Sequence, residues 1–275
     1  MFSRSTNVIV DLEQTRSRRV GILGARVAFI AVMAASLLVA SAASAGHFGK
    51  AIAPGSLAAA FRGGYPELTV KWWTWATGIY PETPILDETG ELCGQGQRGP
   101  VWFLAGSFGS TVVRDCTVPR WKTLFFPVFN TLWWVPEDGN TAAEVRTLSN
   151  DSTVPVFGCE LRPGTPYPDG VCNNNVAQLE MEVLVDGTAL EDIFGYRAQS
   201  PPGGSSYKIN EGSFGNVGFG FEPGDRDPAV ADGYWVMLRP LSRGEHTIVI
   251  RAFVPDMFGP GANFDLDVTY NLTVK

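Results

Sequence analysis

FDLDVTYNLTV, residues 264–274, alternates apolar and polar side chains from end to end. The apolar set is Phe264, Leu266, Val268, Tyr270, Leu272 and Val274. Successive side chains of a β-strand point to opposite faces, so this pattern predicts a strand with one face buried and the other in solvent. The segment therefore predicts a sheet that covers a hydrophobic core.

Two other segments carry a similar signal. Residues 179–185 (LEMEVLV) alternate with their glutamates outward, and Asp186-Gly187 after them is a frequent hairpin turn. Residues 232–254 (DGYWVMLRPLSRGEHTIVIRAFV) indicate strand, turn and strand, with the turn at Ser242-Arg243-Gly244. The C-terminal third of the chain is therefore predicted to consist mainly of strands.

Shorter strand candidates come before these segments. They are residues 101–105 (VWFLA), 111–118, 124–129 and 132–135. Glycine and proline are abundant, with 31 and 19 residues, and long amphipathic helices are few. Many short strands separated by turns are typical of β-sandwiches, so we predict an all-β fold, a β-sandwich with jelly-roll topology.

One short helix is expected ahead of the strands. In and just before VKWWTWATGIYP, residues 70–81, apolar side chains recur at helical spacing. They are Leu68, Trp72, Trp75 and Ile79. We predict a helix over residues 67–78 that packs on the sandwich through Trp72 and Trp75, with Trp73 off that face. Residues 141–148 are expected to form one or two further helical turns.

Residues 1–45 have the three parts of a secretory signal peptide. Arginines precede the apolar run 27–40, and small residues occupy the positions before a cut after Ala45. The run has 14 residues, fewer than the ~20 that a membrane-spanning helix needs. An uncleaved anchor is the alternative, and a twin-arginine signal is the alternative to ordinary Sec export.

The rest of the chain is predicted to be one exported domain, secreted or periplasmic. We expect residues 46–64 to be a flexible lead-in with a short helix near 57–61, and residues 65–275 to form a single β-sandwich domain. The latter range is Trp-rich before Cys159 and charged and alternating after it, but no boundary linker or repeat separates the two halves.

The exported part is acidic. Residues 1–45 contain five of the 21 basic and two of the 28 acidic side chains of the chain. The remaining residues therefore have 16 basic and 26 acidic side chains, a formal charge of −10. Such a charge repels phosphate backbones and anionic membranes. We therefore expect no nucleic-acid partner and no membrane association after cleavage.

Four cysteines follow the signal peptide: Cys93, Cys116, Cys159 and Cys172. An even number in an exported protein indicates two disulfides, and three pairings are possible. Pairing of sequence neighbours, Cys93 with Cys116 and Cys159 with Cys172, is the simplest. A zinc site is disfavoured, because the chain lacks a C-x-x-C motif and has only two histidines.

Several motifs together resemble a group of exported bacterial proteins. They are W-W-x-W-A at residues 72–76, D-x-T-G-x-x-C-x-x-G-Q-x-G-P-V-W-F-L-A-G at 87–106, R-x-C-x-V-P-x-x-K-x-L-F-F-P-V-x-N at 114–130, and D-G-Y-W-x-M-L-x-P-L at 232–241. The final D-V-T-Y-N-L-T-V is similar to the ending of the same group. The resemblance implies export and a β fold, and it carries over no catalytic residues.

The sequence contains few candidates for catalytic residues. His246, in a strand after a turn, is expected to be structural. Cleavage after Gly46 instead of Ala45 would let His47 bind copper with His246, an alternative that the preferred cleavage site opposes. Gly106-Ser107-Phe108-Gly109 lacks the spacing of a serine-hydrolase elbow. Loop carboxylates could still converge as glycosidase pairs. The candidates are Asp87, Glu88, Glu91, Asp225, Asp227 and Asp232.

Calcium is the cofactor with the best-matched ligands. Asp225 and Asp227, and the run Asn173-Asn174-Asn175, offer hard oxygen ligands on turn-rich backbone. Neither segment has the twelve-residue calcium-loop pattern. We predict a structural calcium site at Asp225 and Asp227.

Aromatic side chains are the remaining functional signal. Tryptophan faces stack on sugar rings, but most tryptophans in a protein are buried. We expect Trp102 and Trp121 to fill the core. Adjacent residues do not both point inward, so one residue of each Trp pair should be partly exposed. Trp73, Trp133 and Trp134 are therefore the predicted ligand contacts.

Three functions follow from these observations. The first is a secreted protein that binds a glycan or cell-envelope material through exposed aromatics, with carbohydrate binding as the expected activity. The second is an extracellular polysaccharide hydrolase or lyase that uses loop carboxylates. The third is a structural or adhesive envelope protein.

Overall fold

The structure is a computed structural model that describes residues 49–80, 83–153, 179–257 and 260–275. The chain divides into two units, residues 1–46 and 47–275, and every described residue belongs to the second. The predicted signal peptide, His47 and the predicted pair Cys159 and Cys172 lie outside the described residues.

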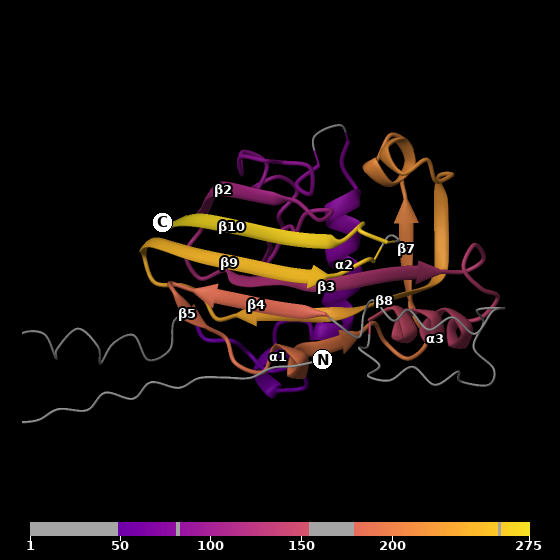
Figure 1. The fold of residues 1–275 in the computed structure, drawn as a ribbon, viewed down its shortest axis with the longest axis horizontal. Coiled ribbons are helices and arrows are strands. Elements are labelled where there is room, and N and C mark those ends of the chain that lie inside the picture. Colours follow the sequence, from indigo (N-terminus) through magenta and orange to yellow (C-terminus); the bar gives the residue numbers. More distant parts are fainter. Residues whose placement is uncertain (1–48, 81–82, 154–178, 258–259) are drawn as a thin grey trace, which may run out of the picture. The chain divides into compact units, whose positions relative to one another are not determined.

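One sheet is built around β10 and is called the β10 sheet (Figure 1). Its order is β2 (Thr111–Val118), β10 (Phe264–Val274), β9 (Gly244–Val254), β4 (Glu180–Val185) and β5 (Thr188–Ala189). β2 runs parallel to β10, and the other neighbours are antiparallel. The hairpin predicted at Asp186-Gly187 is confirmed, since it joins β4 to β5.

The second sheet is built around β8 and is called the β8 sheet. Its strands are β1 (Val101–Phe103), β3 (Thr123–Trp134), β8 (Gly224–Leu238), β6 (Arg197–Gln199) and β7 (Ser205–Ile209). β1 runs parallel to β3, whereas β3, β6 and β7 pair with β8 in antiparallel fashion.

The described residues are thus mostly β-strands in two mixed sheets with few helices, consistent with the predicted all-β class. Two parallel pairs depart from the antiparallel pairing of a jelly roll. The two strands predicted at 124–129 and 132–135 are one strand, β3, with a bulge between Pro127 and Phe129. The bulge accommodates Pro127, which has no amide hydrogen for the ladder.

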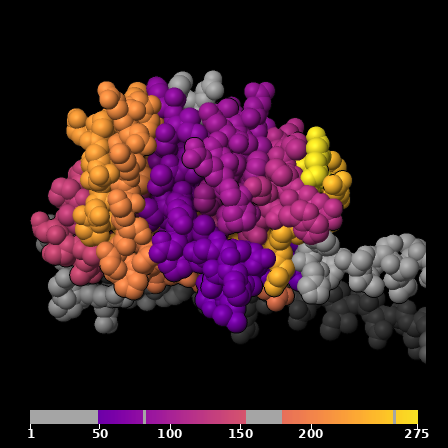
Figure 2. All heavy atoms as spheres, turned by 180° about the vertical axis from the view of Figure 1, so that it is seen from behind, coloured from indigo at the N-terminus to yellow at the C-terminus, as the bar shows by residue number. Residues whose placement is uncertain are grey.

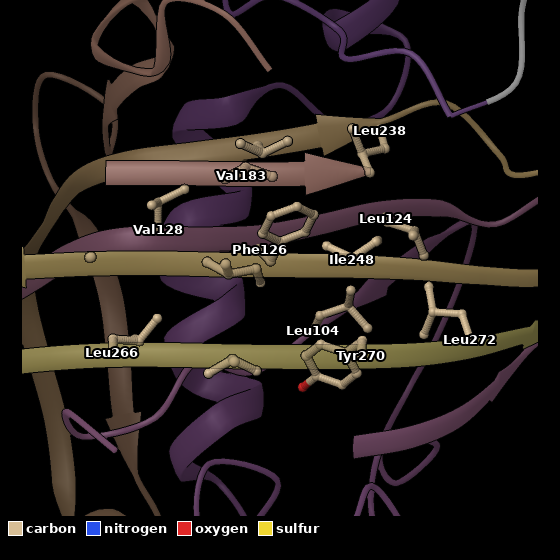
Figure 3. Close-up of a cluster of buried hydrophobic side chains, with 14 of the residues drawn as sticks. Leu104, Leu124, Phe126, Val128, Val183, Leu238, Ile248, Leu266, Tyr270 and Leu272 are labelled. Carbon is tan, nitrogen blue, oxygen red and sulfur yellow. The ribbon is translucent and has the colours of Figure 1, made fainter. Parts of the chain in front are cut away.

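The main hydrophobic core is built from residues of both sheets (Figure 3). Phe126 of β3, Val183 of β4, Ile248 of β9 and Tyr270 of β10 belong to it, and none is more than 2% exposed. Full burial of a large apolar side chain contributes roughly 1.5–3 kcal/mol. The alternation predicted for β10 is confirmed, because its even-numbered residues from 266 to 274 are buried and those between them are not.

Three helices accompany the sheets: α1 (Leu57–Ala60), α2 (Tyr65–Thr77) and α3 (Ala142–Thr153). α2 confirms the helix predicted over 67–78, with Pro66 in its first turn and Gly78 at its C-cap. α3 is longer than the one or two turns predicted at 141–148.

α2 covers the face of the β8 sheet opposite the main core. Phe125 and Trp235 form a second cluster with Trp72, while their neighbours Phe126 and Val236 point into the main core. The Trp72 and Trp235 rings meet edge to face with centroids 5.7 Å apart. The predicted inward direction of Trp72 and Trp75 is confirmed, at 3% and 8% exposure.

Residues 49–64, predicted as part of a flexible lead-in, pack against the β8 sheet instead. Ala51 bridges Leu238 at the end of β8, and Ile52 is 2% exposed. Tyr65 donates its hydroxyl to the Ile52 carbonyl at 2.5 Å and accepts the Met237 amide at 3.0 Å. The apolar residues among the glycines supply the burial that fixes this segment.

Residues 199–216 contain regular structure, although their sequence (QSPPGGSSYKINEGSFGN) has the composition of a flexible loop. β7 occupies Ser205–Ile209, and a π-helical turn begins at Phe214. Tyr207 and Ile209 are buried between α2 and β8, which fixes β7 at the sheet edge. Two buried side chains in an otherwise polar stretch were too weak a pattern to predict this strand.

Candidate functional site

A groove of about 690 Å³ lies beside α2. Figure 2 shows the face that holds it, where the indigo and purple residues of α2 run beside the orange residues around β7. Its polar lining comprises Arg62, Lys71, Thr74, Arg98 and Asn210, and Trp75 and Phe103 contribute apolar atoms. Helix, loop and sheet edge thus each contribute a wall.

The groove is lined by cations and by no carboxylate. Arg62 is fixed in place, because its Nε donates to Thr123 Oγ1 at 2.9 Å and its Nη1 to the Ala58 carbonyl at 2.6 Å. Lys71 and Arg98 are exposed, and neither takes part in an ion pair with the other described residues. The groove therefore offers positive charge that an anionic ligand could neutralise.

The apolar side of the groove is built by close contact between α2 and the segment before β1. Trp75 Nε1 donates to the Gln95 carbonyl at 2.8 Å, and its ring lies 5.5 Å from that of Phe103. Gly96 has φ +66°, and a Cβ there would lie 3.1 Å from Ile79 Cδ1. Glycine is favoured at this position by both its conformation and the close approach.

A disulfide and a buried arginine hold the same segment on the β10 sheet. Cys93 and Cys116 are joined with a Cα–Cα distance of 6.0 Å, which confirms this predicted pairing. The disulfide indicates an oxidising environment, as outside the cell. Arg114, 1% exposed, donates to four backbone carbonyls and to the Tyr270 hydroxyl.

Asp87 caps the turn that follows it. One of its carboxylate oxygens accepts the amides of Thr89 at 2.9 Å and Gly90 at 2.8 Å, and the other accepts the Leu92 amide at 2.8 Å. Burial raises the pKa of the Asp87 carboxyl, but these hydrogen bonds outweigh burial and leave the pKa below its ordinary value. Asp87 is therefore explained as a structural carboxylate.

The predicted ligand contacts Trp73, Trp133 and Trp134 do not line the groove. Trp73 is half-buried between two apolar clusters, so it forms a second layer of core. Trp134 is 7% exposed and packs on Tyr207 and Phe221, with centroids 5.6 and 4.9 Å away. Trp133 is half-buried, as expected for one residue of the pair. Their role in ligand binding stays a prediction.

Trp121 is the tryptophan whose predicted position is wrong. It was expected in the core, but it is 61% exposed, in the turn between β2 and β3. Its φ is +72°, and the Arg120 guanidinium lies 3.9 Å from the centroid of its ring. Trp102, the other expected core residue, is buried.

Asp225 and Asp227 lie on β8 and not on the predicted loop. Both are exposed, and they flank Arg226, whose Nε lies 2.7 Å from Glu137 Oε1. Lys208 of β7 is the cross-strand neighbour of Asp225, and an extended strand does not wrap its carbonyls around an ion. No cluster of three metal-ligating side chains occurs among the described residues, and the calcium site stays a prediction.

Asp232 is part of a buried ion pair that the sequence did not reveal. It lies on β8, not in a loop, and Arg197 donates to both of its oxygens at 3.0 and 2.6 Å. Gln199 and the Gly233 amide complete the contacts, at 2.6 and 2.7 Å. Because the buried carboxylate is fully bonded, a structural role accounts for it.

His246 is bonded through both ring nitrogens. Its Nδ1 lies 2.8 Å from Asp186 Oδ2, and its Nε2 lies 3.1 Å from Ser242 Oγ and 3.0 Å from the Ser242 carbonyl oxygen. The Thr247 amide donates to the other Asp186 oxygen at 2.9 Å. Asp, His and Ser thus stand in the order of a serine-hydrolase triad.

The groove cations were missed because each is isolated in the sequence. Arg62, Lys71 and Arg98 come from three separate segments, and the fold alone brings them to one surface. The R-G-P tripeptide before β1 is the one local signal, since it places an arginine on a turn beside a buried strand.

Comparison with protein-family models, curated proteins and solved structures gives no match for this chain. Within the described ranges, no helix has the length and apolar character needed to cross a bilayer.

Proposed function

We propose that this chain is an exported binding protein of the cell envelope, and that the groove beside α2 binds an anionic glycan. The observation that carries the proposal is the set of groove cations Arg62, Lys71 and Arg98 beside the apolar atoms of Trp75 and Phe103. Acidic sugars combine a carboxylate or phosphate with an apolar ring face, and both features have a counterpart in this lining.

The way the fold fixes the groove wall supports a binding role for the groove. We propose that the two sheets form a β-sandwich, since residues of both contribute to one core, with α2 as an added layer on the β8 sheet. The disulfide and the Arg114 contacts fix one wall of the groove to the β10 sheet. Such preorganisation lowers the entropy lost on binding.

The test compares binding of an acidic and a neutral polysaccharide by affinity electrophoresis, with polygalacturonate and dextran as probes. We expect retardation by polygalacturonate alone, and a loss of roughly tenfold in affinity, about 1.4 kcal/mol, in the double variant Lys71→Ser/Asn210→Ala. Lys208→Ser is the matched control, because Lys208 is an exposed cation of β7 outside the groove. Equal retardation of the double variant and the control would refute the groove as the binding site.

Extracellular hydrolysis is a second candidate function, favoured by Asp186, His246 and Ser242. Their order would let His246 Nε2 accept the Ser242 hydroxyl proton while Asp186 orients the ring. It ranks second because Nε2 also lies 3.0 Å from the Ser242 carbonyl oxygen, an acceptor that competes for the Nε2 hydrogen. The predicted carboxylate pairs rank lower still, since Asp87 and Asp232 are occupied by structural contacts.

A fluorophosphonate probe distinguishes the two candidate functions. Hydrolase chemistry requires covalent labelling at Ser242 that is lost in Ser242→Ala and in His246→Gln. Ser107→Ala serves as the control, because Ser107 bonds within its own turn, to Ser110. Absence of labelling in the unmodified protein would remove hydrolysis by Ser242 and leave the binding proposal standing.

A further inference from the structure

We propose that one end of the two sheets docks on an anionic lipid bilayer. The end is defined by register: Val274 of β10 pairs with Val118 of β2 and with Gly244 of β9. In the β8 sheet, Leu124 of β3 pairs with Leu238 of β8. The β2–β3 and β8–β9 turns therefore lie at one end, which we call the basic end, beside the C-terminus in Figure 1.

Cations gather at the basic end from several segments. They are Arg98, Arg120, Lys122, Arg239, Arg243 and Lys275. Hydrogen bonds hold the segments together, since the Arg120 amide donates to the Lys275 carbonyl at 2.7 Å, and the Lys122 side chain donates through Nζ to the Gly99 carbonyl. None of the six forms an ion pair with another described residue.

Carboxylates at the same end have polar partners. Glu245 accepts the Thr273 hydroxyl at 2.9 Å, and Asp186 lies 2.8 Å from the His246 ring. The cations outnumber them, although the chain as a whole has a formal charge of −7. The basic end therefore attracts a negative surface while the acidic remainder is repelled, which orients the protein.

The segment around α1 and the β2–β3 turn carry exposed apolar side chains. Leu57 and Phe61, four residues apart around α1, are 79% and 87% exposed. Their segment joins the basic end through Arg62, which donates to Thr123 at the start of β3. Trp121, 61% exposed in the β2–β3 turn, adds the ring type that favours the bilayer interface.

These exposed side chains select a bilayer over a soluble polyanion. A polyanion neutralises the cations but gives Leu57 and Phe61 no apolar phase, whereas the headgroup–acyl boundary provides both. Trp121 keeps its ring 61% exposed although its φ of +72° is an unfavourable conformation for a bulky residue. The proposal does not depend on occupation of the groove, whose test uses Lys71 and Asn210.

The experiment is co-sedimentation of the purified chain with vesicles of phosphatidylcholine, with and without phosphatidylglycerol. We expect binding to the mixed vesicles alone, weakened by salt. Arg120→Ser/Lys122→Ser should lose about tenfold in affinity and Leu57→Ser/Phe61→Ser several-fold. The controls are Lys208→Ser for charge and Val113→Ser, 56% exposed on β2, for apolar exposure.

Three outcomes would overturn the proposal. Equal binding to both vesicle types would show that the cations play no part. Unchanged affinity of both double variants would place the contact elsewhere. Binding to soluble polygalacturonate that falls in Arg120→Ser/Lys122→Ser, without vesicle binding by the unmodified chain, would assign the basic end to a polyanion. Circular dichroism of each variant checks that all four retain the fold.

Discussion

Asp87 stabilises the fold through its charge. Its folded-state pKa lies below the ordinary value of 3.8, because hydrogen bonds to the carboxylate outweigh the effect of burial. A carboxyl group with a depressed pKa contributes stability above its unfolded pKa, and the contribution is lost as pH falls through the folded pKa. We therefore expect Asp87→Asn to lower the free energy of unfolding by about 1–3 kcal/mol near neutral pH and by less well below 3.8.

Urea unfolding at several pH values measures this effect. Glu88→Gln is the matched control, because Glu88 is the adjacent carboxylate and is exposed. The control should differ little from the unmodified protein at any pH. A deficit of Asp87→Asn that stays constant as the solution is acidified would show that shape, and not charge, is what matters at this position.

Single residues also mark the limit of prediction from sequence. The burial of Trp72 and Trp75 followed from helical spacing, because a repeated apolar face has to pack on something. Trp121 has no repeat around it, so its type alone suggested burial, and the turn that exposes it depends on contacts with the distant C-terminus. Residue type predicts an average environment, whereas periodicity predicts a specific one.

At the scale of elements, the contact between α2 and the segment before β1 decides the shape of the groove. Gly96 and Gly99 both have positive φ, at +66° and +68°, but a Cβ at Gly96 would press on Ile79 and Trp75 whereas one at Gly99 meets nothing within 4 Å. Both alanine variants share the backbone strain, of order 1 kcal/mol. We expect Gly96→Ala to be less stable than Gly99→Ala by a further ~1 kcal/mol or more, and to bind polygalacturonate more weakly.

Thermal unfolding compares the two glycine variants, and affinity electrophoresis compares their binding. Equal melting temperatures would mean that α2 yields easily and that the groove wall is less rigid than its contacts suggest. Because the two positions share their conformation, only the close packing at Gly96 can produce a difference between them.

Elements whose apolar residues recur at a regular spacing could be predicted from the sequence, whereas elements that form only by pairing with another strand could not. β10, β4 and α2 carry their burial pattern within their own sequence, and each lies where the pattern placed it. β8 was longer than predicted, since its first residues include the exposed Asp225 and Asp227 and become a strand through pairing with β7. A strand edge of this kind is defined by its neighbour, which the local sequence does not contain.

For the whole molecule, net charge was a poor guide to surface charge. The acidic composition predicted that the protein would repel anions. The fold nevertheless collects Arg98, Arg120 and Lys122 at one end. The carboxylates Glu182 and Asp267 lie elsewhere, on the outer face of the β10 sheet, where both pair with Arg251. The sequence gives the net charge, but only the fold shows where on the surface the positive and negative side chains lie. The groove cations were unpredictable for the same reason, because they come from three segments.

The disulfide joins the groove wall to the β10 sheet, so its loss should affect stability and ligand binding together. Cys93 and Cys116 are separated by 23 residues in sequence, and closing a loop of such a length stabilises a protein by about 3 kcal/mol. We expect Cys93→Ser/Cys116→Ser to lower the free energy of unfolding by that amount and to weaken polygalacturonate binding. Urea unfolding of this variant, beside the unmodified chain with and without a reductant, measures the first effect. Unchanged stability together with unchanged binding would contradict both expectations and would mean that the Arg114 contacts hold the segment in place without the disulfide.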